Sequence, residues 1–283
     1  MEISIICPIY NGQKYIKGLY SEICNQRDVN IREVKFILTE SSDRSEEILK
    51  ELNLNYEKIK PEEFSHSLIR EKEAFSAGGD IIVFITQDIK ICNENWLHNL
   101  VEGIISGECE AAFSRQIAYE NHYTEKYIRE KNYPETSRVV SKKDIDKLGL
   151  MTFFFSDASS AICKKVFTEL NGYDSKDLPT SEDMYIAYKI IMNGYRIKYA
   201  ADSKVVHSHK YDIRGTIQRY KAIGAFFKQN PHLKRYNANK RGVEVLIYTF
   251  KRAIKEKKYS VILQSFFDMI IRFVGMNLGK ITH

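Results

Sequence analysis

Five consecutive apolar residues, Ile81–Ile85, stand between Asp80 and the polar sequence Thr86-Gln87-Asp88. A short run of β-branched and aromatic residues predicts a strand that is buried on both faces. Such strands occur in parallel α/β sheets covered by helices, and ligands bind just past the carboxyl ends of these strands. We therefore expect Asp88 at a ligand-binding edge of the sheet. An aspartate in an ordinary strand-end turn is the alternative interpretation.

Strand-like and helix-like segments alternate through the first third of the chain. Apolar runs predict strands at residues 3–7, 34–38 and 55–59. Helical periodicity predicts helices at residues 13–24, 45–52 and 67–76. This order predicts a mostly parallel sheet with right-handed crossover connections. No glycine-rich phosphate loop follows the first strand, which argues against an NAD-dependent enzyme or an ATPase.

The second half of the chain is less regular. Residues 115–150 are polar, and we expect helical pieces and a mobile loop there. Helices are predicted at 164–170 and 184–192, and a strand at 197–200. Ser181 or Asp183 could simply cap the helix at 184–192, because serine and aspartate are favoured helix caps.

The charge is distributed unevenly. Residues 211–283 contain 15 Lys and Arg against 4 Asp and Glu, whereas the remainder contains 28 against 33. A basic, mostly helical tail suggests an anionic partner, and a membrane surface is favoured over nucleic acid. We expect no membrane-spanning helix, because polar residues interrupt the apolar segment at 261–274. That segment is predicted to be an interfacial amphipathic helix, or a helix docked on the body or on a second subunit.

The expected fold class is therefore α/β, with a mixed, mostly parallel sheet flanked by helices. A catalytic domain is predicted at residues 1–212 and a basic helical extension at residues 213–283. The five cysteines lie far apart in sequence, which argues against a disulfide framework or a zinc site and fits a reducing compartment. We therefore expect a cytoplasmic protein at the inner face of the plasma membrane.

Four short motifs occur in the order found in inverting family 2 glycosyltransferases. They are Pro8–Asn11, Glu40–Asp43, Thr86–Asp88 and Glu182–Asp183. Residues 1–230 thus resemble this family, which implies a Rossmann-like GT-A fold that binds a nucleotide sugar. Two departures from the family pattern are visible: Glu40 replaces an aspartate, and Thr86 replaces the first carboxylate of a metal-binding D-x-D motif.

A narrower resemblance points to bacterial rhamnosyltransferases. Asn95–Leu97, Phe155–Asp157, Ser160 and His207–Tyr211 are similar to members that make cell-surface polysaccharide from dTDP-L-rhamnose. The segment Phe64–Glu71 is looser than the corresponding family segment, although Arg70 keeps its positive charge. A UDP-hexose transferase of the same fold and a non-catalytic, nucleotide-sugar-binding homologue that docks at the membrane are the alternatives.

Glycosyl transfer from a nucleotide sugar has two chemical requirements. The departing diphosphate needs positive charge, which a Mg²⁺ or Mn²⁺ ion supplies through oxygen ligands. The acceptor hydroxyl needs a general base within hydrogen-bond reach. The resemblance implies that Asp183 is this base, and that attack from the face opposite the leaving group inverts the anomeric carbon.

The remaining candidate residues fall into three groups. Nucleotide-sugar binding is assigned to Pro8, Tyr10, Asn11, Glu40, Ser42, Arg70, Gln87 and Asp88. The acceptor or sugar pocket is assigned to Asp157, Ser160 and Glu182. Metal binding is assigned to Asp88, His207 and His209. The expected partners are a dTDP- or UDP-linked donor, a glycan or lipid-linked acceptor and the membrane, with no nucleic acid; a homodimer is an alternative.

Overall fold

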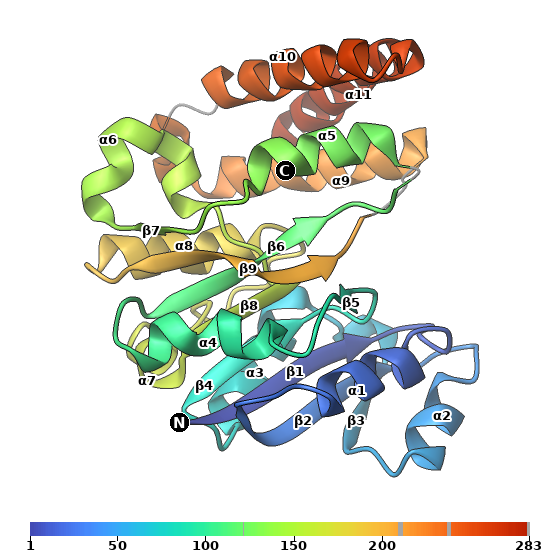
Figure 1. The fold of residues 1–283 in the computed structure, drawn as a ribbon, viewed down its shortest axis with the longest axis vertical. Helices are drawn as coiled ribbons and strands as arrows, with labels where there is room; N and C mark the ends of the chain where they lie inside the picture. The colour runs from blue at the N-terminus through green and yellow to red at the C-terminus, as the bar shows by residue number, and fades with distance from the viewer. Residues whose placement is uncertain (121, 209–211, 237–238, 282–283) are drawn as a thin grey trace.

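The computed structural model describes residues 1–120, 122–208, 212–236 and 239–281 (Figure 1). The strands are β1 Glu2–Ile9, β2 Asn30–Thr39, β3 Tyr56–Ile59, β4 Ile81–Ile85, β5 Lys90–Ile91, β6 Ala111–Ile117, β7 Arg138–Val140, β8 Ser159–Cys163 and β9 Ile197–Val206. The helices are α1 Ile16–Cys24, α2 Ser45–Glu51, α3 His66–Ser76, α4 Trp96–Ile105, α5 Tyr123–Asn132, α6 Ile145–Leu148, α7 Lys164–Glu169, α8 Glu182–Met192, α9 Ile213–Gln229, α10 Asn239–Lys255 and α11 Tyr259–Ile281.

The described strands form one mixed sheet in the order β3-β2-β1-β4-β8-β6-β9-β5, and β7 also pairs with β9. Strands β1 to β4 are parallel, as the alternation of strands and helices predicts. Strand β8 runs antiparallel to both β4 and β6, whereas β6 and β9 are parallel to each other. The predicted mixed α/β fold is confirmed.

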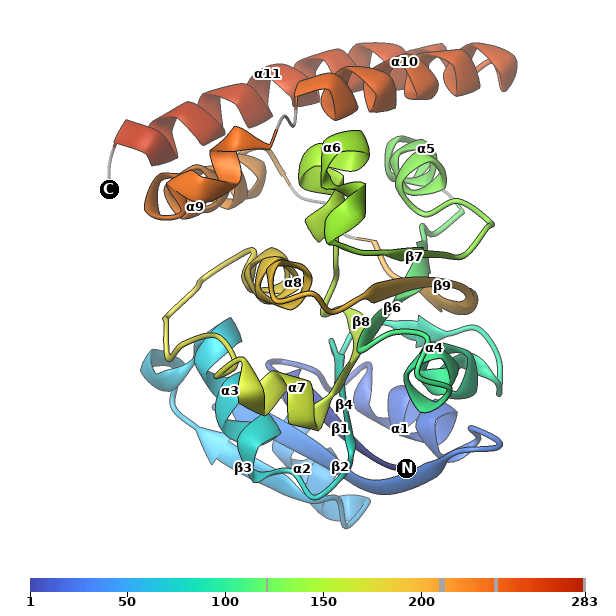
Figure 2. The same ribbon diagram turned by 90° about the vertical axis from the view of Figure 1, so that its left-hand side faces the viewer.

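Strand β4 is buried on both faces, as its sequence predicts: all five of its residues are buried. Its odd-numbered residues, Ile81, Val83 and Ile85, pack in a core with residues of α1, α2 and α4. Ile82 and Phe84 point to the opposite face and pack with residues of α3, α7 and α8. Figure 2 shows these two sets of helices on either side of the sheet. The alternation follows from the two-residue repeat of a strand.

Residues 115–150 are more regular than the sequence indicates. The helical pieces are present as α5 and α6, but the prediction omitted strand β7 and the extension of β6 to Ile117. Strand β7 is three residues long and exists through its antiparallel pairing with β9. The buried ring of Tyr127 on α5 packs against Ala253 of α10 and Val261 after the α10–α11 turn. These contacts join distant parts of the chain and have no local sequence signal.

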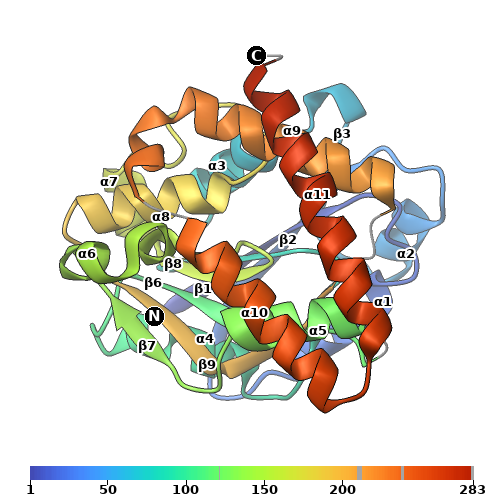
Figure 3. The ribbon, with the colours of Figure 1, turned by 90° about the horizontal axis from the view of Figure 1, so that it is seen from above.

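Helices α10 and α11 form an outer layer above α5, α6 and α9 (Figures 1 to 3). Helix α11 lies against α9 through glycines, because a Cβ atom on Gly275 would lie 2.8 Å from the carbonyl oxygen of Ile217. Added Cβ atoms on Gly224 and Gly279 would also collide with the backbone of the facing helix. Contrary to the expectation from its polar breaks, α11 is long and apolar enough to cross a membrane by length and composition.

Candidate active site

A cavity of about 810 Å³ opens at the carboxyl ends of β1 and β4. Tyr10 and Gln87 line it beyond these strands, and Asp183 lines it from the first turn of α8. Arg219 and Ile223 of α9 contribute a further wall. The cavity therefore lies where ligands bind in open α/β sheets, and the C-terminal extension covers part of it.

The turn after β1, residues Pro8–Gln13, is fixed by the segment that follows β2. Asn11 has a φ of 46°, and its Oδ1 accepts a hydrogen bond of 3.0 Å from the Ser42 N–H. The Asn11 N–H donates to Ser41 Oγ at 3.0 Å, and the Gly12 N–H donates to Ser45 Oγ at 2.7 Å. These bonds orient the turn in advance, so that its exposed residues present a fixed surface.

Gln87 links the same turn to the end of β4. The Tyr10 N–H donates to Gln87 Oε1 at 2.9 Å, and Gln87 Nε2 donates to the Tyr10 carbonyl at 2.8 Å. A Cβ atom on Gly12 would lie 2.6 Å from the same Oε1, so this close approach requires glycine. The amide of Gln87 therefore positions Tyr10, whose side chain is 55% exposed at the cavity.

A cluster of charged groups, which we call the acidic cluster, forms the opposite wall. It consists of Asp157, Glu182 and Asp183 together with Arg70 of α3. Arg70 is 2% exposed, and its Nη1 donates to Glu182 Oε1 at 3.0 Å. Asp157 is also buried, and its two carboxyl oxygens accept hydrogen bonds from Ser160 Oγ (2.7 Å) and the Tyr173 hydroxyl (2.9 Å).

The acidic cluster changes the proton affinity of Asp183. Burial raises the pKa of its carboxyl well above the usual range, and the neighbouring charges of Glu182 and Asp157 raise it further. A hydrogen bond from the Met184 N–H to Asp183 Oδ1 (2.7 Å) and the charge of Arg70 oppose this rise. A carboxyl with a raised pKa is a better proton acceptor when ionised than an ordinary aspartate. Its position in a cavity marks it as a functional candidate.

The capping alternative does not fit Ser181. Ser181 occupies the N-cap position of α8 with a φ of 60°, and its side chain makes no capping hydrogen bond. Asp183 lies inside the first turn, where its Oδ1 accepts a hydrogen bond from the N–H of the next residue, Met184, and its side chain still lines the cavity. The geometry leaves Asp183 available for chemistry.

Asp88 lies beside the cavity wall rather than in it. Its Oδ1 is 3.6 Å from His207 Nε2, and His207 lines the cavity. The other ring nitrogen of His207 is 3.0 Å from Gln116 Oε1. Among the described residues, no group of three or more His, Cys, Asp and Glu side chains could hold a metal ion. His209, the third predicted ligand, lies outside the described residues.

Apart from Asp88 and His209, the predicted site residues divide into three sets. Those that line the cavity are Pro8, Tyr10, Arg70, Gln87, Asp157, Glu182, Asp183 and His207. Asn11, Glu40 and Ser42 lie in the turns after β1 and β2, next in sequence to lining residues or near them, and Glu40 and Ser42 are exposed. The prediction for Ser160 needs correction: it is fully buried, and its hydroxyl contacts Asp157 instead of the pocket.

Sequence reasoning missed several wall residues. Three of them come from a stretch that the sequence predicts to be partly loop: Gln116 on β6, Arg129 on α5 and Tyr133 directly after α5. Arg219 of α9, which belongs to the basic helical extension, also lines the cavity. His66 also lines the cavity, and burial together with the adjacent Arg70 lowers its pKa to about 4. Among these residues His66 has a sequence signal, because it lies in the segment Phe64–Glu71, one helical turn before Arg70.

Comparisons with known proteins identify the family of the chain. Residues 4–170 match the family model described as Glycosyl transferase family 2. The chain is 30% identical to the O-antigen chain rhamnosyltransferase RfbN of Salmonella typhimurium, over 99% of this chain and 90% of that protein. It is 28% identical to the O-antigen chain rhamnosyltransferase WbaN of Salmonella anatum, over 98% and 89% of the two chains.

The fold is also found in solved structures. The mannosyltransferase PcManGT from Pyrobaculum calidifontis, determined with GDP-Man and Mn²⁺, superposes with a TM-score of 0.65. The alignment covers 99% of this chain and 87% of that one at 14% sequence identity, so the likeness concerns the fold. The predicted GT-A architecture is thereby confirmed. The family match over more than half of the sequence and the near full-length relatives together show that the chain belongs to glycosyl transferase family 2.

Proposed function

We propose that this glycosyltransferase transfers L-rhamnose from dTDP-rhamnose to a hydroxyl of a lipid-linked glycan, with inversion, in the synthesis of bacterial cell-surface polysaccharide. The observation that carries the proposal is the cavity, which has the fixed turn after β1 on one side and Asp183 on the other. The two rhamnosyltransferase relatives, which align along nearly the whole chain, support rhamnose as the donor sugar.

Asp183 acts as the general base in this proposal. Its carboxylate accepts the proton of the acceptor hydroxyl while that oxygen attacks the anomeric carbon and the bond to the diphosphate breaks. Proton acceptance by a positioned side chain contributes about 10²–10⁴-fold to a rate. Arg70 Nη1 lies 3.0 Å from Glu182 Oε1 and holds that carboxyl in place, and Glu182 orients sugar hydroxyls in this proposal.

The donor is bound across the opposite wall. Tyr10 is exposed at the cavity and is positioned to stack on the nucleotide base. Glu40 is exposed after β2 and accepts a hydrogen bond from the base N3–H in this proposal. Pro8, Asn11 and Ser42 shape the turn that carries Tyr10.

Asp88 and His207 fit a divalent cation. Their facing atoms are 3.6 Å apart, and neighbouring ligands of an octahedral Mg²⁺ or Mn²⁺ ion lie about 3 Å apart. Such ions keep several waters and substrate phosphates as ligands, so two protein ligands suffice. A bound ion would neutralise the charge that develops on the departing diphosphate. His209 remains a proposed third ligand.

A donor panel tests the proposed activity. Purified enzyme and the glycolipid that accumulates in cells lacking it are incubated with dTDP-rhamnose, UDP-glucose or UDP-galactose, with Mn²⁺ or with EDTA. We expect transfer from dTDP-rhamnose, loss with EDTA and recovery with excess Mn²⁺ or Mg²⁺. Preference for a UDP-hexose would replace the donor assignment. Binding of nucleotide without turnover of any donor would favour a non-catalytic homologue.

We further propose that residues 213–283 form the membrane-docking extension of a catalytic domain at residues 1–212. Helix α11 exposes a face of large apolar side chains, including Leu263 (61% exposed) and Phe273 (70% exposed). Helix α10 and the following turn add lysines, among them Lys251, Lys255 and Lys257. An apolar face flanked by basic residues is the composition of helices that lie in an anionic membrane interface.

Vesicle sedimentation tests this placement. The wild-type protein is expected to sediment with vesicles that contain anionic lipid. The variant Leu263→Ser/Phe273→Ser is expected to sediment less with the same vesicles. Ile105→Ser on α4 is the matched control, because Ile105 is 50% exposed outside this layer. Unchanged sedimentation of the α11 variant, with a loss of dimer in light scattering, would assign the face to a second copy.

A further inference from the structure

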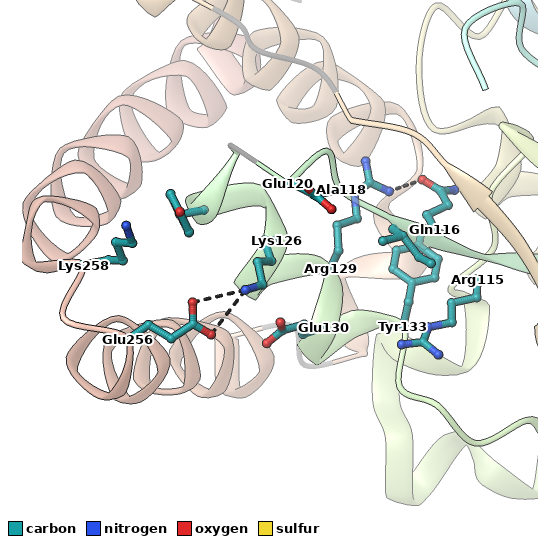
Figure 4. A pocket seen from close by; sticks show the side chains of 12 residues that line it. Arg115, Gln116, Ala118, Glu120, Lys126, Arg129, Glu130, Tyr133, Glu256 and Lys258 are labelled. Carbon is teal, nitrogen blue, oxygen red and sulfur yellow. Dashed lines mark hydrogen bonds and ion pairs between the residues drawn. The ribbon is translucent and has the colours of Figure 1, made fainter. Parts of the chain in front are cut away.

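A second cavity, of about 690 Å³, lies behind the wall formed by β6 and α5. Figure 4 shows its labelled side chains, which come from β6, the connection that follows it, α5 with the next residue, and the turn between α10 and α11. Gln116, Arg129 and Tyr133 line both this cavity and the active-site cavity. Its volume is within the range of about 300–1,000 Å³ that is typical of small-molecule sites. We call it the outer cavity.

The wall between the cavities is close to the proposed base. Burial raises the pKa of the Tyr133 phenol, Arg129 opposes the rise, and the nearby carboxylate of Asp183 adds to it. Arg129 also lies over the Tyr133 ring at 5.5 Å and donates a hydrogen bond to Gln116 Oε1. The two cavities therefore adjoin at these three shared side chains, and the sugars that precede a terminal hydroxyl at Asp183 would lie on the side of the outer cavity.

The positive and negative charges around the outer cavity are balanced. This balance distinguishes a neutral ligand from a diphosphate. Lys126 lies 3.1 Å from Glu256, and Arg115 lies 2.9 Å from Glu135. Glu130 pairs with Arg252 at 2.8 Å. A diphosphate would need an excess of positive charge, but the lining residues and their ion-pair partners carry equal numbers of each sign. A neutral ligand with many hydroxyl groups fits this lining better.

The polar lining supplies what such a ligand needs. Carboxylates, including the exposed Glu120, accept hydrogen bonds, and Lys258 and Arg129 donate them. Tyr123 contributes an aromatic ring, with the ammonium of Lys258 4.4 Å from its centroid. Sugars present hydroxyls at their edges and C–H groups on their faces, so donors, acceptors and a ring match them together.

We propose that the outer cavity is a subsite for the neutral sugars that precede the acceptor hydroxyl. The proposal rests on the glycosyl transfer proposed above and names the substrate class of that same site: an oligosaccharide acceptor instead of a single sugar. The recognition of several sugars would select the growing glycan at the correct length.

A charge-neutral double variant tests the subsite. Glu120→Ala/Lys258→Ala removes one acceptor and one donor without altering the net charge, and Glu102→Ala/Lys165→Ala is the control on exposed side chains of α4 and α7. Two probes are compared. The first is the acceptor glycan released by mild acid from its lipid in cells lacking the enzyme, and the second is the methyl glycoside of its terminal sugar.

The expected result is a split between the two probes. For the released glycan, KM should rise about tenfold, which corresponds to about 1.4 kcal/mol of lost binding, while kcat is unchanged. For the methyl glycoside, kcat/KM should stay within the range of the wild type. Equal losses for both probes, or no loss for either, would overturn the subsite. Transfer from dTDP-rhamnose to the released glycan by the wild type is measured in parallel, because its absence would instead contradict the proposed function.

Labelling provides a readout that does not depend on turnover. The released glycan should slow modification of Lys258 by an amine-reactive reagent, whereas Lys165 should react at the same rate with or without the glycan. Equal reactivity of Lys258 in both conditions would contradict glycan binding in the outer cavity.

Discussion

The two walls of the active-site cavity are built on different physical principles. The turn after β1 is exposed and is held by neutral hydrogen bonds, such as those between Gln87 and the backbone of Tyr10. In the acidic cluster Arg70, Asp157 and Glu182 are buried and Asp183 is partly buried, and the three carboxyl groups share one guanidinium, that of Arg70. The first wall is organised by geometry, and the second is dominated by charge.

This difference separates two tasks of a transferase. A fixed turn made of backbone and amide contacts keeps its shape when a charged nucleotide arrives, so it suits binding and orientation. A carboxylate in a buried, negatively charged setting has a raised pKa, so it suits proton acceptance. Substitutions on the charged wall should therefore affect stability and pH dependence, whereas those on the neutral wall should affect donor affinity.

The largest effect is expected from Arg70→Gln. This change leaves the carboxylates of the acidic cluster without their buried counter-charge. Breaking a buried ion pair by removing one partner costs about 3–5 kcal/mol of unfolding free energy. Chemical denaturation should show a loss of that size. The double variant Arg70→Gln/Glu182→Gln should recover part of the lost stability, because the second change removes the carboxylate that pairs with Arg70 at 3.0 Å. Equal stability of the single and double variants would contradict a stabilising role for this ion pair.

A smaller effect of a different kind is expected from Gln87→Leu. The backbone N–H and carbonyl of Tyr10 lose their partners, and the turn after β1 loosens. Each lost partner costs about 1–3 kcal/mol when the group is buried, and the exposed position of Tyr10 places the effect at the low end. The KM for the donor should rise about tenfold with a minor change in kcat.

Gln26→Leu is the control for this prediction. Gln26 also bridges segments through its amide, since it accepts from the Leu97 N–H at 2.9 Å and donates to the Asn93 carbonyl at 3.1 Å. It lies outside the active-site cavity, so stability should fall while the donor KM stays constant. If both variants changed the donor KM equally, the turn would not have a specific role in binding.

The pH dependence of kcat should report the charged wall. Burial raises the pKa of Asp183 first, and Glu182 and Asp157 add to the rise. The rate should therefore fall on the acid side at a pH above the usual aspartate pKa of about 3.9. In Glu182→Gln this acid limb should move to lower pH, because one negative neighbour is gone. A limb that does not move would mean that another group titrates.

The same raised pKa affects stability. Asp183 binds its proton more tightly in the folded state, so its contribution to stability is fully present below the unfolded-state pKa and is lost as pH rises through the folded-state pKa. Asp183→Asn removes this loss, and its Tm at pH 7 should exceed that of the wild type. Calorimetry at pH 4 and pH 7 checks the prediction: the gain should be larger at pH 7.

The smallest effect is expected from Ser160→Ala. The hydroxyl of Ser160 donates to Asp157 Oδ1 at 2.7 Å and is fully buried. Loss of this hydrogen bond should cost about 1 kcal/mol of unfolding free energy. The KM for the acceptor should be unchanged. A marked rise in this KM would show that Ser160 does contribute to acceptor binding.

Regular secondary structure was well predicted where a local pattern decides it. The doubly buried β4 and the helix α8 follow from hydrophobic runs and periodicity, and the structure confirms both. Strand β7 and the ordered stretch around Tyr127 depend on β9 and on α10, which lie far away in sequence. A single sequence contains no local sign of such pairings.

The same division applies to the site. Tyr10, Gln87 and Asp183 were predicted because each follows a strand or begins a helix in a motif that resembles the family, and all three line the cavity. Gln116 and Arg219 were missed because β6 and α9 lie beside the cavity only as a result of long-range packing, which no local sequence pattern reveals. The glycines that let α11 approach α9 were missed for the same reason.

The assignment of Asp183 as the general base is tested most directly by Asp183→Asn, with kcat and the dissociation constant of dTDP-rhamnose measured on the same preparation. The amide has nearly the same shape and can still accept the hydrogen bond from the Met184 N–H, so folding and donor binding should be retained. We expect kcat to fall by about 10²–10⁴-fold with the donor dissociation constant unchanged. Turnover near that of the wild type would contradict the assignment.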